Sequence, residues 1–239
     1  MAGALFACTA DTPSPSVEQP SPTPTFECPN QASTVEDANA LVGEPATSDV
    51  DGDGSSDAVS IHLDTAGERG CQAFLVVEVD TGRLSLPIWE VGPQGGLPQP
   101  TIKAIVDIDS DGSSEIVLDE ALGASTQFVG LYALSDGGLT WVRSRTDQGG
   151  LFPYGGSVGH LEAVDCTNEG SLVVSAALPS PDRSAQARQI YDVRRRFFSL
   201  EDGQLVAENT ETESLPIDDL ERFPEYLSSP FGNCPPPPS

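Results

Sequence analysis

Two acidic segments, DIDSDGSSE at residues 107–115 and DVDGDGSSD at residues 49–57, decide how the rest of this chain is interpreted. Both follow the pattern D-x-D-x-D-G-x-x-[DE]. Carboxylates at positions 1, 3, 5 and 9, a glycine for a sharp turn at position 6 and a backbone carbonyl at position 7 can converge on one hard cation. Without an ion the carboxylates repel each other and raise one another's pKa, and a bound Ca2+ removes that conflict. The pattern therefore predicts two calcium loops.

The residues that follow the two loops indicate β-strands. The helical calcium loop of sensor proteins needs a glutamate at position 12, where this chain has Ser60 and Leu118. Apolar residues alternate with others at 58–63, and residues 116–118 form a short apolar run that is mostly β-branched. We therefore expect both loops to connect strands. The alternative is a pair of acidic Asx-turns without metal, because Asp and Gly are ordinary turn residues.

The acidic loop recurs along the chain at a fixed spacing. The second copy begins 58 residues after the first, and a degenerate third copy begins 58 residues later at Asp165. Thr167 and Glu169 replace the second and third aspartates there, and two residues are missing before the next apolar run. We expect this third loop to keep the shape of the repeat without its metal.

Hairpin signals follow each loop and complete the repeat. Tight turns at residues 80–82, 136–137 and 202–203 contain Asp and Gly between β-rich runs, which is typical of β-hairpins. Together with the loops they predict an all-β fold of three units, each with about four short strands. The expected units lie near residues 45–100, 101–158 and 159–210.

The repeat resembles the FG-GAP/VCBS repeat family, whose members form β-propeller blades in integrin α-chains and in many bacterial secreted proteins. The resemblance covers residues 45–207 and implies that Ca2+ binds each acidic loop, with the backbone carbonyls of Ser55 and Ser113 as ligands. The implied side-chain ligands are Asp49, Asp51, Asp53 and Asp57 in the first loop, and Asp107, Asp109, Asp111 and Glu115 in the second.

Three units are fewer than the four to eight blades that typically close a propeller. We therefore expect a compact all-β domain of three blade-like antiparallel units over residues 28–234. Residues 28–48 and the C-terminal segment are expected to cover exposed sheet edges. The alternative is a partial propeller completed by self-association.

The N-terminal region indicates export. Residues 1–7 resemble the remnant of a bacterial lipoprotein signal before a lipidated Cys8, and residues 8–27 form a linker rich in Pro, Ser and Thr. Residues 235–239 are expected to be a disordered tail. No stretch of about eighteen apolar residues is present, so we expect membrane attachment only through Cys8. The alternative is a cytosolic protein with a disordered tail that begins at a true Met1.

The cysteines favour disulfides in an extracellular protein. Besides Cys8 there are four, an even number without a C-x-x-C pair, which argues against a zinc site. Of the three possible pairings we favour Cys28 with Cys71 and Cys166 with Cys234, because each ties a chain end to the nearest repeat. The alternative is four buried free thiols in a cytosolic protein.

Charge and motifs narrow the possible functions. The formal net charge of −26 excludes a general nucleic-acid binder and argues against docking on anionic lipid. No catalytic motif is present. We therefore expect a non-enzymatic, calcium-binding module at the cell surface or in the envelope, which binds an unidentified protein or glycan partner or has a structural role. The alternative is a secreted glycan-active enzyme whose catalytic carboxylates lie outside the two loops.

Overall fold

The computed structural model describes most of the chain beyond the N-terminal segment. The described residues are 28–29, 31–37, 40–68, 70–88, 99–135, 137–145, 150–157, 159–181 and 190–237. The expected signal remnant, Cys8 and the linker 8–27 lie outside these residues. The described part is all-β, as expected, and its strands form two open sheets, neither of which closes on itself.

The first sheet is a four-stranded antiparallel meander in the order β1-β2-β3-β4. The acidic segment 49–57 connects its first two strands, and the Asp-Thr-Gly turn connects its last two. The strands are β1 (Leu41–Ser48), β2 (Asp57–Leu63), β3 (Ala73–Val79) and β4 (Gly82–Pro87).

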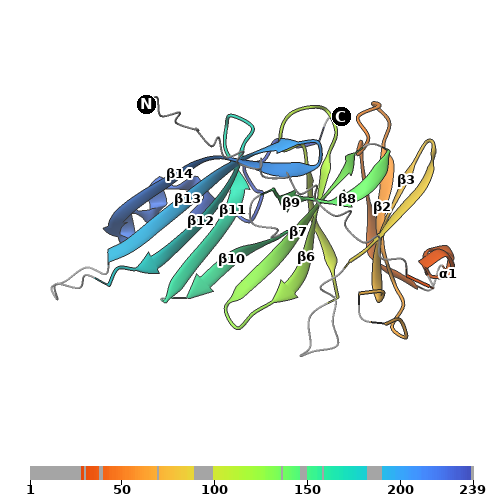
Figure 1. Ribbon diagram of the computed structural model, residues 1–239, viewed down its shortest axis with the longest axis horizontal. Helices are drawn as coiled ribbons and strands as arrows, with labels where there is room; N and C mark the ends of the chain where they lie inside the picture. The colour runs from red at the N-terminus through yellow and green to blue at the C-terminus, as the bar shows by residue number, and fades with distance from the viewer. Residues whose placement is uncertain are drawn as a thin grey trace, which may run out of the picture.

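The second sheet contains ten strands and lies beside the first (Figure 1). Its order is β5-β6-β7-β10-β11-β12-β13-β14-β9, with β8 paired to β7, and the short β14–β9 pair is parallel. The strands are β5 (Thr101–Val106), β6 (Glu115–Leu122), β7 (Thr126–Ser135), β8 (Gly138–Trp141), β9 (Arg143–Ser144), β10 (Leu151–Ser157), β11 (His160–Cys166), β12 (Leu172–Pro179), β13 (Ile190–Glu201) and β14 (Gln204–Pro216).

Strand β7 joins two meanders into this large sheet. One side of β7 pairs with β6, whereas its other side pairs with β10 over residues 126–130 and with β8 over residues 132–135. The described chain therefore contains one four-stranded meander in each expected unit: β1–β4, β5–β8 and β11–β14. Strand β10, which no sequence pattern predicts, pairs with β7 and β11 and so joins the second meander to the third.

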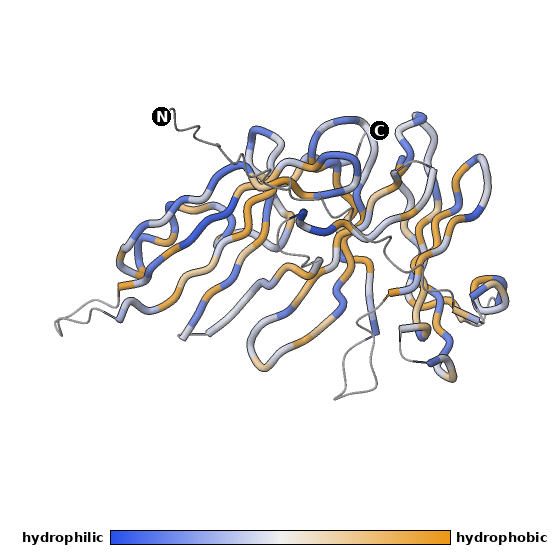
Figure 2. The backbone as a smooth tube through the Cα atoms, in the orientation of Figure 1, coloured by the Kyte–Doolittle hydropathy of each residue, from blue (hydrophilic) through white to orange (hydrophobic). Residues whose placement is uncertain are grey.

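One hydrophobic core cluster lies where the two sheets meet. Val50 and Ile61 of the first sheet region belong to the same buried cluster as Ile116 and Leu118 of β6. A second cluster lies within the large sheet and includes Ile108 and Phe231. Figure 2 shows the apolar residues concentrated along the central strands of both sheets. Burial of this apolar surface is the main force that holds the sheets together.

Helix α1 (Gln31–Glu36) and the C-terminal 3₁₀ helices cover sheet faces, whereas residues 41–48, part of the segment expected to cover an edge, form β1, which pairs with β2 at the edge of the first sheet. Helix α1 packs through Val35 against Phe74 and Val76, on the face of β3 opposite the inter-sheet core. Because both faces of β3 are covered, its sequence is almost continuously apolar. The 3₁₀ helices η2 (Ile217–Arg222) and η3 (Pro224–Tyr226) cover the face of strands β11–β14. Among the helices described, none has the length and apolar character needed to cross a lipid bilayer.

Candidate metal centre

The two acidic loops occupy equivalent places and are closed by the same hydrogen bond. Each connects the first strand of a meander to the second. The backbone N–H of Val50 donates to Asp57 Oδ2 at 2.8 Å, and that of Ile108 donates to Glu115 Oε2 at 2.8 Å. Val50 and Ile108 are fully buried in the core, which fixes the start of each loop and turns the neighbouring acids toward one another.

The first aspartate of each loop organises the turn. Asp49 accepts hydrogen bonds from the backbone N–H groups of Gly52, Asp53 and Gly54. In the second loop Asp107 accepts the corresponding N–H groups at positions 5 and 6. The position-6 glycine has φ of +88° in the first loop and +98° in the second, a left-handed conformation that glycine adopts without strain.

Three acids in each loop converge as a cation site requires. One carboxylate oxygen from each of Asp49, Asp51 and Asp57 lies within 4.8 Å of the other two, and Asp107, Asp109 and Glu115 form the matching group. Positions 1 and 9 are buried and position 3 is half-buried. These are residues that the sequence analysis proposes as ligands.

The other proposed side-chain ligands, Asp53 and Asp111, lie outside these two groups. Each accepts the backbone N–H of the serine two residues later, Ser55 or Ser113, at 2.7 Å. Position 5 of each loop is exposed. These aspartates therefore shape the loops in this structure, while the clustered oxygens come from positions 1, 3 and 9.

The donor set fits a divalent cation. No lysine or arginine among the residues described forms an ion pair with any of the clustered acids. Burial, reinforced by the neighbouring carboxylates, raises the pKa of Asp51 and Asp109, and it raises the pKa of Glu115 to about 8. Converging carboxylates without a basic partner are unfavourable, and Ca2+, which prefers oxygen ligands, would relieve that repulsion.

In the third loop, hydrogen bonds from the C-terminal segment satisfy the buried carboxylate at position 1. Asp165, at the position of Asp49 and Asp107, is fully buried. It accepts hydrogen bonds from the Asn233 backbone N–H at 2.9 Å and side-chain Nδ2 at 2.6 Å, and also from the Ser228 hydroxyl. Neutral donors of the C-terminal segment therefore satisfy this carboxylate, and it does not belong to either metal-binding group.

Two disulfides fix the chain near its ends. Cys28 is bonded to Cys71, and Cys166 is bonded to Cys234. These are the pairs that the sequence analysis favours. The second disulfide holds Asn233 beside Asp165. The predicted Cys166–Cys234 pairing was therefore the sequence signal that could have located the cap on the third loop, that is, the hydrogen bonds from Asn233 and Ser228 to Asp165.

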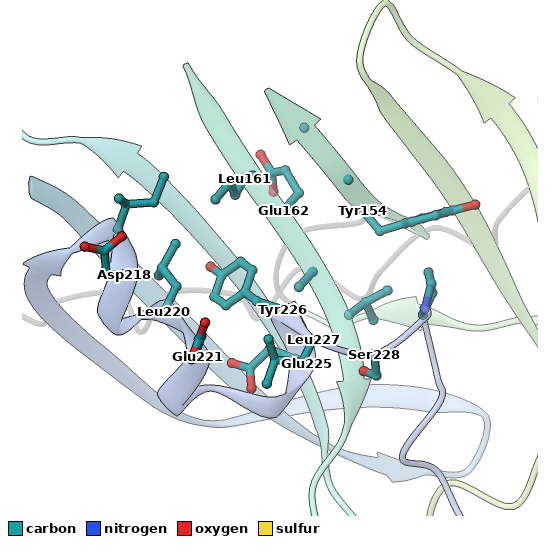
Figure 3. A pocket seen from close by; sticks show the side chains of 16 residues that line it. Tyr154, Leu161, Glu162, Asp218, Leu220, Glu221, Glu225, Tyr226, Leu227 and Ser228 are labelled. Carbon is teal, nitrogen blue, oxygen red and sulfur yellow. The ribbon is translucent and has the colours of Figure 1, made fainter. Parts of the chain in front are cut away.

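A separate cavity lies between strands β10–β11 and the η2–η3 segment (Figure 3). Its volume is about 550 Å³, and Glu162 of β11 and Glu225 of η3 line it together with Tyr226. The pKa of Glu162 is raised by burial. Glu225 is buried and already engaged, because it accepts hydrogen bonds from Arg195 Nε at 2.7 Å and Ser175 Oγ at 2.6 Å. Nothing in the sequence pattern pointed to this cavity.

No protein-family model matches the chain, and no curated protein or solved structure was found to be similar to it. The fold and the sites define an all-β protein with two open sheets, two disulfides and two acidic clusters that could hold a metal ion. Its function is therefore inferred from the geometry of these loops.

Proposed function

We propose that this chain is a non-enzymatic calcium-binding module of the cell surface or envelope, built from repeats of the FG-GAP/VCBS type. The observation that carries the proposal is the agreement between two loops 58 residues apart. They share the same closing hydrogen bond and the same convergence of acids at positions 1, 3 and 9. Acidic Asx-turns without metal would leave this convergence of three carboxylates without a cation to offset their repulsion.

The role proposed for Ca2+ is structural. Asp49, Asp51 and Asp57 would hold one ion, and Asp107, Asp109 and Glu115 the other, with further oxygen ligands from Asp53, Asp111 and the carbonyls of Ser55 and Ser113. Extracellular calcium modules typically bind with Kd of roughly 10⁻⁴ to 10⁻³ M. At a free Ca2+ concentration ten times the Kd, binding stabilises the folded state by about 1.4 kcal/mol per site.

The proposed location is outside the cell. Two disulfides favour an oxidising compartment. Cys8 would carry the lipid anchor, and residues 8–27 would separate the domain from the membrane. The partner would be a protein or a glycan, because the net charge of −26 disfavours nucleic acid and anionic lipid.

Calorimetry with and without calcium tests the proposal. The melting temperature of the full chain should rise by several degrees between chelator and 10 mM Ca2+, about ten times the weak end of the expected Kd range, and Mg2+ should restore it poorly. Asp51→Ala should remove much of the response of the first loop, and Asp109→Ala that of the second. Glu169→Ala, in the degenerate third loop, is the matched control and should keep the full response. A melting temperature that does not depend on Ca2+ contradicts the proposal.

A secreted glycan-active enzyme is the second candidate. It requires a carboxylate pair outside the loops, and the cavity beside η3 brings Glu162 and Glu225 together. We place it second because Glu225 is engaged by Arg195 and Ser175. Release of reducing sugar from a polysaccharide mixture, abolished by Glu162→Gln and unaffected by Glu208→Gln, which does not line the cavity, would favour the enzyme.

A further inference from the structure

The two acidic loops are in direct contact with each other. Gly52, at position 4 of the first loop, lies against the second loop so closely that an added Cβ would be 2.9 Å from Ser113 Oγ and 3.6 Å from the carbonyl carbon of Gly112. Beside this contact, Ser48 Oγ donates a buried hydrogen bond of 3.2 Å to Ser114 Oγ. Each loop therefore forms part of the other loop's surroundings.

The third loop also contacts the second acidic loop, at Ile108 and Asp109. A Cβ on Gly170 would lie 3.7 Å from the carbonyl oxygen of Ile108 and 3.8 Å from that of Asp109. The third loop is itself closed by Asn233 and by the Cys166–Cys234 disulfide. The second acidic loop therefore contacts both a loop that the protein closes by itself and the first acidic loop.

We propose that the two calcium sites are coupled, so that an ion in either loop raises the affinity of the other. This inference rests on the proposed function. An ion in the first loop fixes the backbone around Gly52, and that backbone is the surface on which Gly112 and Ser113 lie. The second loop then loses less conformational freedom when its own ion binds.

Electrostatics acts in the opposite direction. The first ion reduces the negative potential that attracts the second, which weakens the second binding step. The aspartates at positions 3 and 5 of both loops are half-buried or exposed, and salt screens exposed charges beyond about 8 Å at physiological ionic strength. The contact between the loops is packed and partly buried, so salt does not weaken it. We therefore expect the effect of the pre-ordered backbone to exceed the electrostatic effect, so that an ion in one loop raises the Ca2+ affinity of the other roughly fivefold or more.

Calcium titrations of variants with one working loop measure the coupling directly. Asp51→Asn removes ion binding from the first loop and leaves the second loop to be titrated, and Asp109→Asn does the reverse. The probe is Ca2+ alone, added to the full, disulfide-bonded chain at fixed ionic strength in a calorimeter. Each variant should bind its remaining ion at least about fivefold more weakly than the same site binds Ca2+ in the wild type when the other site is filled. Linkage requires these two site-specific factors to be equal.

Two glycine variants test whether the inter-loop contact carries the coupling. Gly52 and Gly54 both have a left-handed backbone, and both donate their N–H to Asp49. A Cβ on Gly54 meets nothing within 4 Å, whereas one on Gly52 meets the second loop. Gly54→Ala should therefore weaken ion binding by the first loop and leave the coupling factor between the loops unchanged, whereas Gly52→Ala should also reduce that factor. Combining Gly52→Ala with Ser113→Gly should restore the affinity of the second loop.

The outcomes separate this inference from the proposed function. Absence of Ca2+ binding in the wild type overturns both. If the wild type binds two ions and each site has the same affinity in the wild type and in the variant with only that loop working, the coupling is overturned and the calcium function stays intact. If Asp51→Asn or Asp109→Asn does not fold, the titrations of Gly52→Ala and Gly54→Ala in the otherwise unchanged chain decide, because equal coupling factors in these two variants exclude coupling through the contact.

Discussion

At the scale of single residues, the buried carboxylates at position 1 of the three loops distinguish the sites. Asp49 and Asp107 face further acids, whereas Asp165 faces Asn233 and Ser228. The sequence pattern predicts the first two as metal ligands and the third loop as degenerate. It did not identify the cap on Asp165, because Asn233 lies 68 residues away and a pattern of local spacing contains no information about that contact.

We expect Asn233→Ala to destabilise the fold by about 1–3 kcal/mol, since it removes a donor from the fully buried Asp165 carboxylate. Asn209→Ala is the control, because Asn209 is exposed and, within the described residues, its side chain accepts a hydrogen bond only from the next backbone N–H, that of Thr210. Urea denaturation with the disulfides intact measures both. Equal stabilities of the two variants would show that Asn233 contributes nothing to the cap.

His62 should make the protein sensitive to mild acid. Burial on β2 lowers its pKa below the ordinary value near 6.5, and the Thr34 backbone only partly opposes this. As the pH falls below about 6.5, the unfolded chain binds a proton at this residue before the folded chain does. The free energy of unfolding therefore decreases over that range.

The difference between wild type and His62→Gln isolates this effect. The wild type should lose more stability than the variant in urea denaturation between pH 7.5 and the lowered pKa. Ser60→Ala removes the hydroxyl 3.2 Å from His62 Nε2 but keeps the imidazole, so this control should retain the wild-type pH dependence. Parallel curves for wild type and His62→Gln would contradict the prediction.

At the scale of elements, the sequence predicts the strands better than their partners. Alternating apolar residues and Asp-Gly turns located the hairpins β3–β4, β7–β8 and β13–β14. Strand β10 was not anticipated, because its sequence LFPYGGS contains one proline and two glycines, residues that are rare in strands. Which strands pair with β7 depends on contacts between segments that are separated in the sequence, and local sequence patterns do not predict such contacts.

Gly130 shows how closely β6 and β7 approach each other. A Cβ at this position would lie 1.6 Å from Glu120 Oε1, and Glu120 accepts a 2.8 Å hydrogen bond from the Tyr132 hydroxyl. Gly130→Ala must therefore displace a buried side chain, and we expect it to cost about 1–3 kcal/mol of stability. Gly138→Ala, in β8, meets only Ser135 O at 3.8 Å and should change stability little. Chemical denaturation compares them, and similar losses would rule out the steric explanation.

At the scale of the whole molecule, three meanders form two open sheets, so edge strands remain. The longest is β14, which pairs along one side with β13 and contacts β9 only through Gln204 and Leu205 on the other. Residues 207–214 of this strand are exposed. An exposed edge of this length invites pairing with another chain unless its side chains prevent it.

The composition of β14 provides that protection. Glu208, Glu211 and Glu213 lie within its exposed part, where Glu211 pairs with Arg195 and Glu213 with Arg222. Antiparallel pairing of two copies of this edge would bring these glutamates together and compete with their ion pairs. The net charge of −26 adds repulsion between whole molecules. We therefore expect a monomer, in contrast to the alternative of a partial propeller completed by self-association.

Neutralising the edge should allow association. A triple variant with Glu208, Glu211 and Glu213 each changed to Gln removes the repulsion between edges, so light scattering should show a mass that increases with protein concentration, while the wild type stays monomeric. The control changes Asp218 and Asp219 to Asn and Glu221 to Gln, which alters the net charge equally on the exposed surface of η2. Association of both triple variants would assign the effect to net charge alone. A wild type that is already dimeric would show that this edge is not protected and would favour the self-associating propeller.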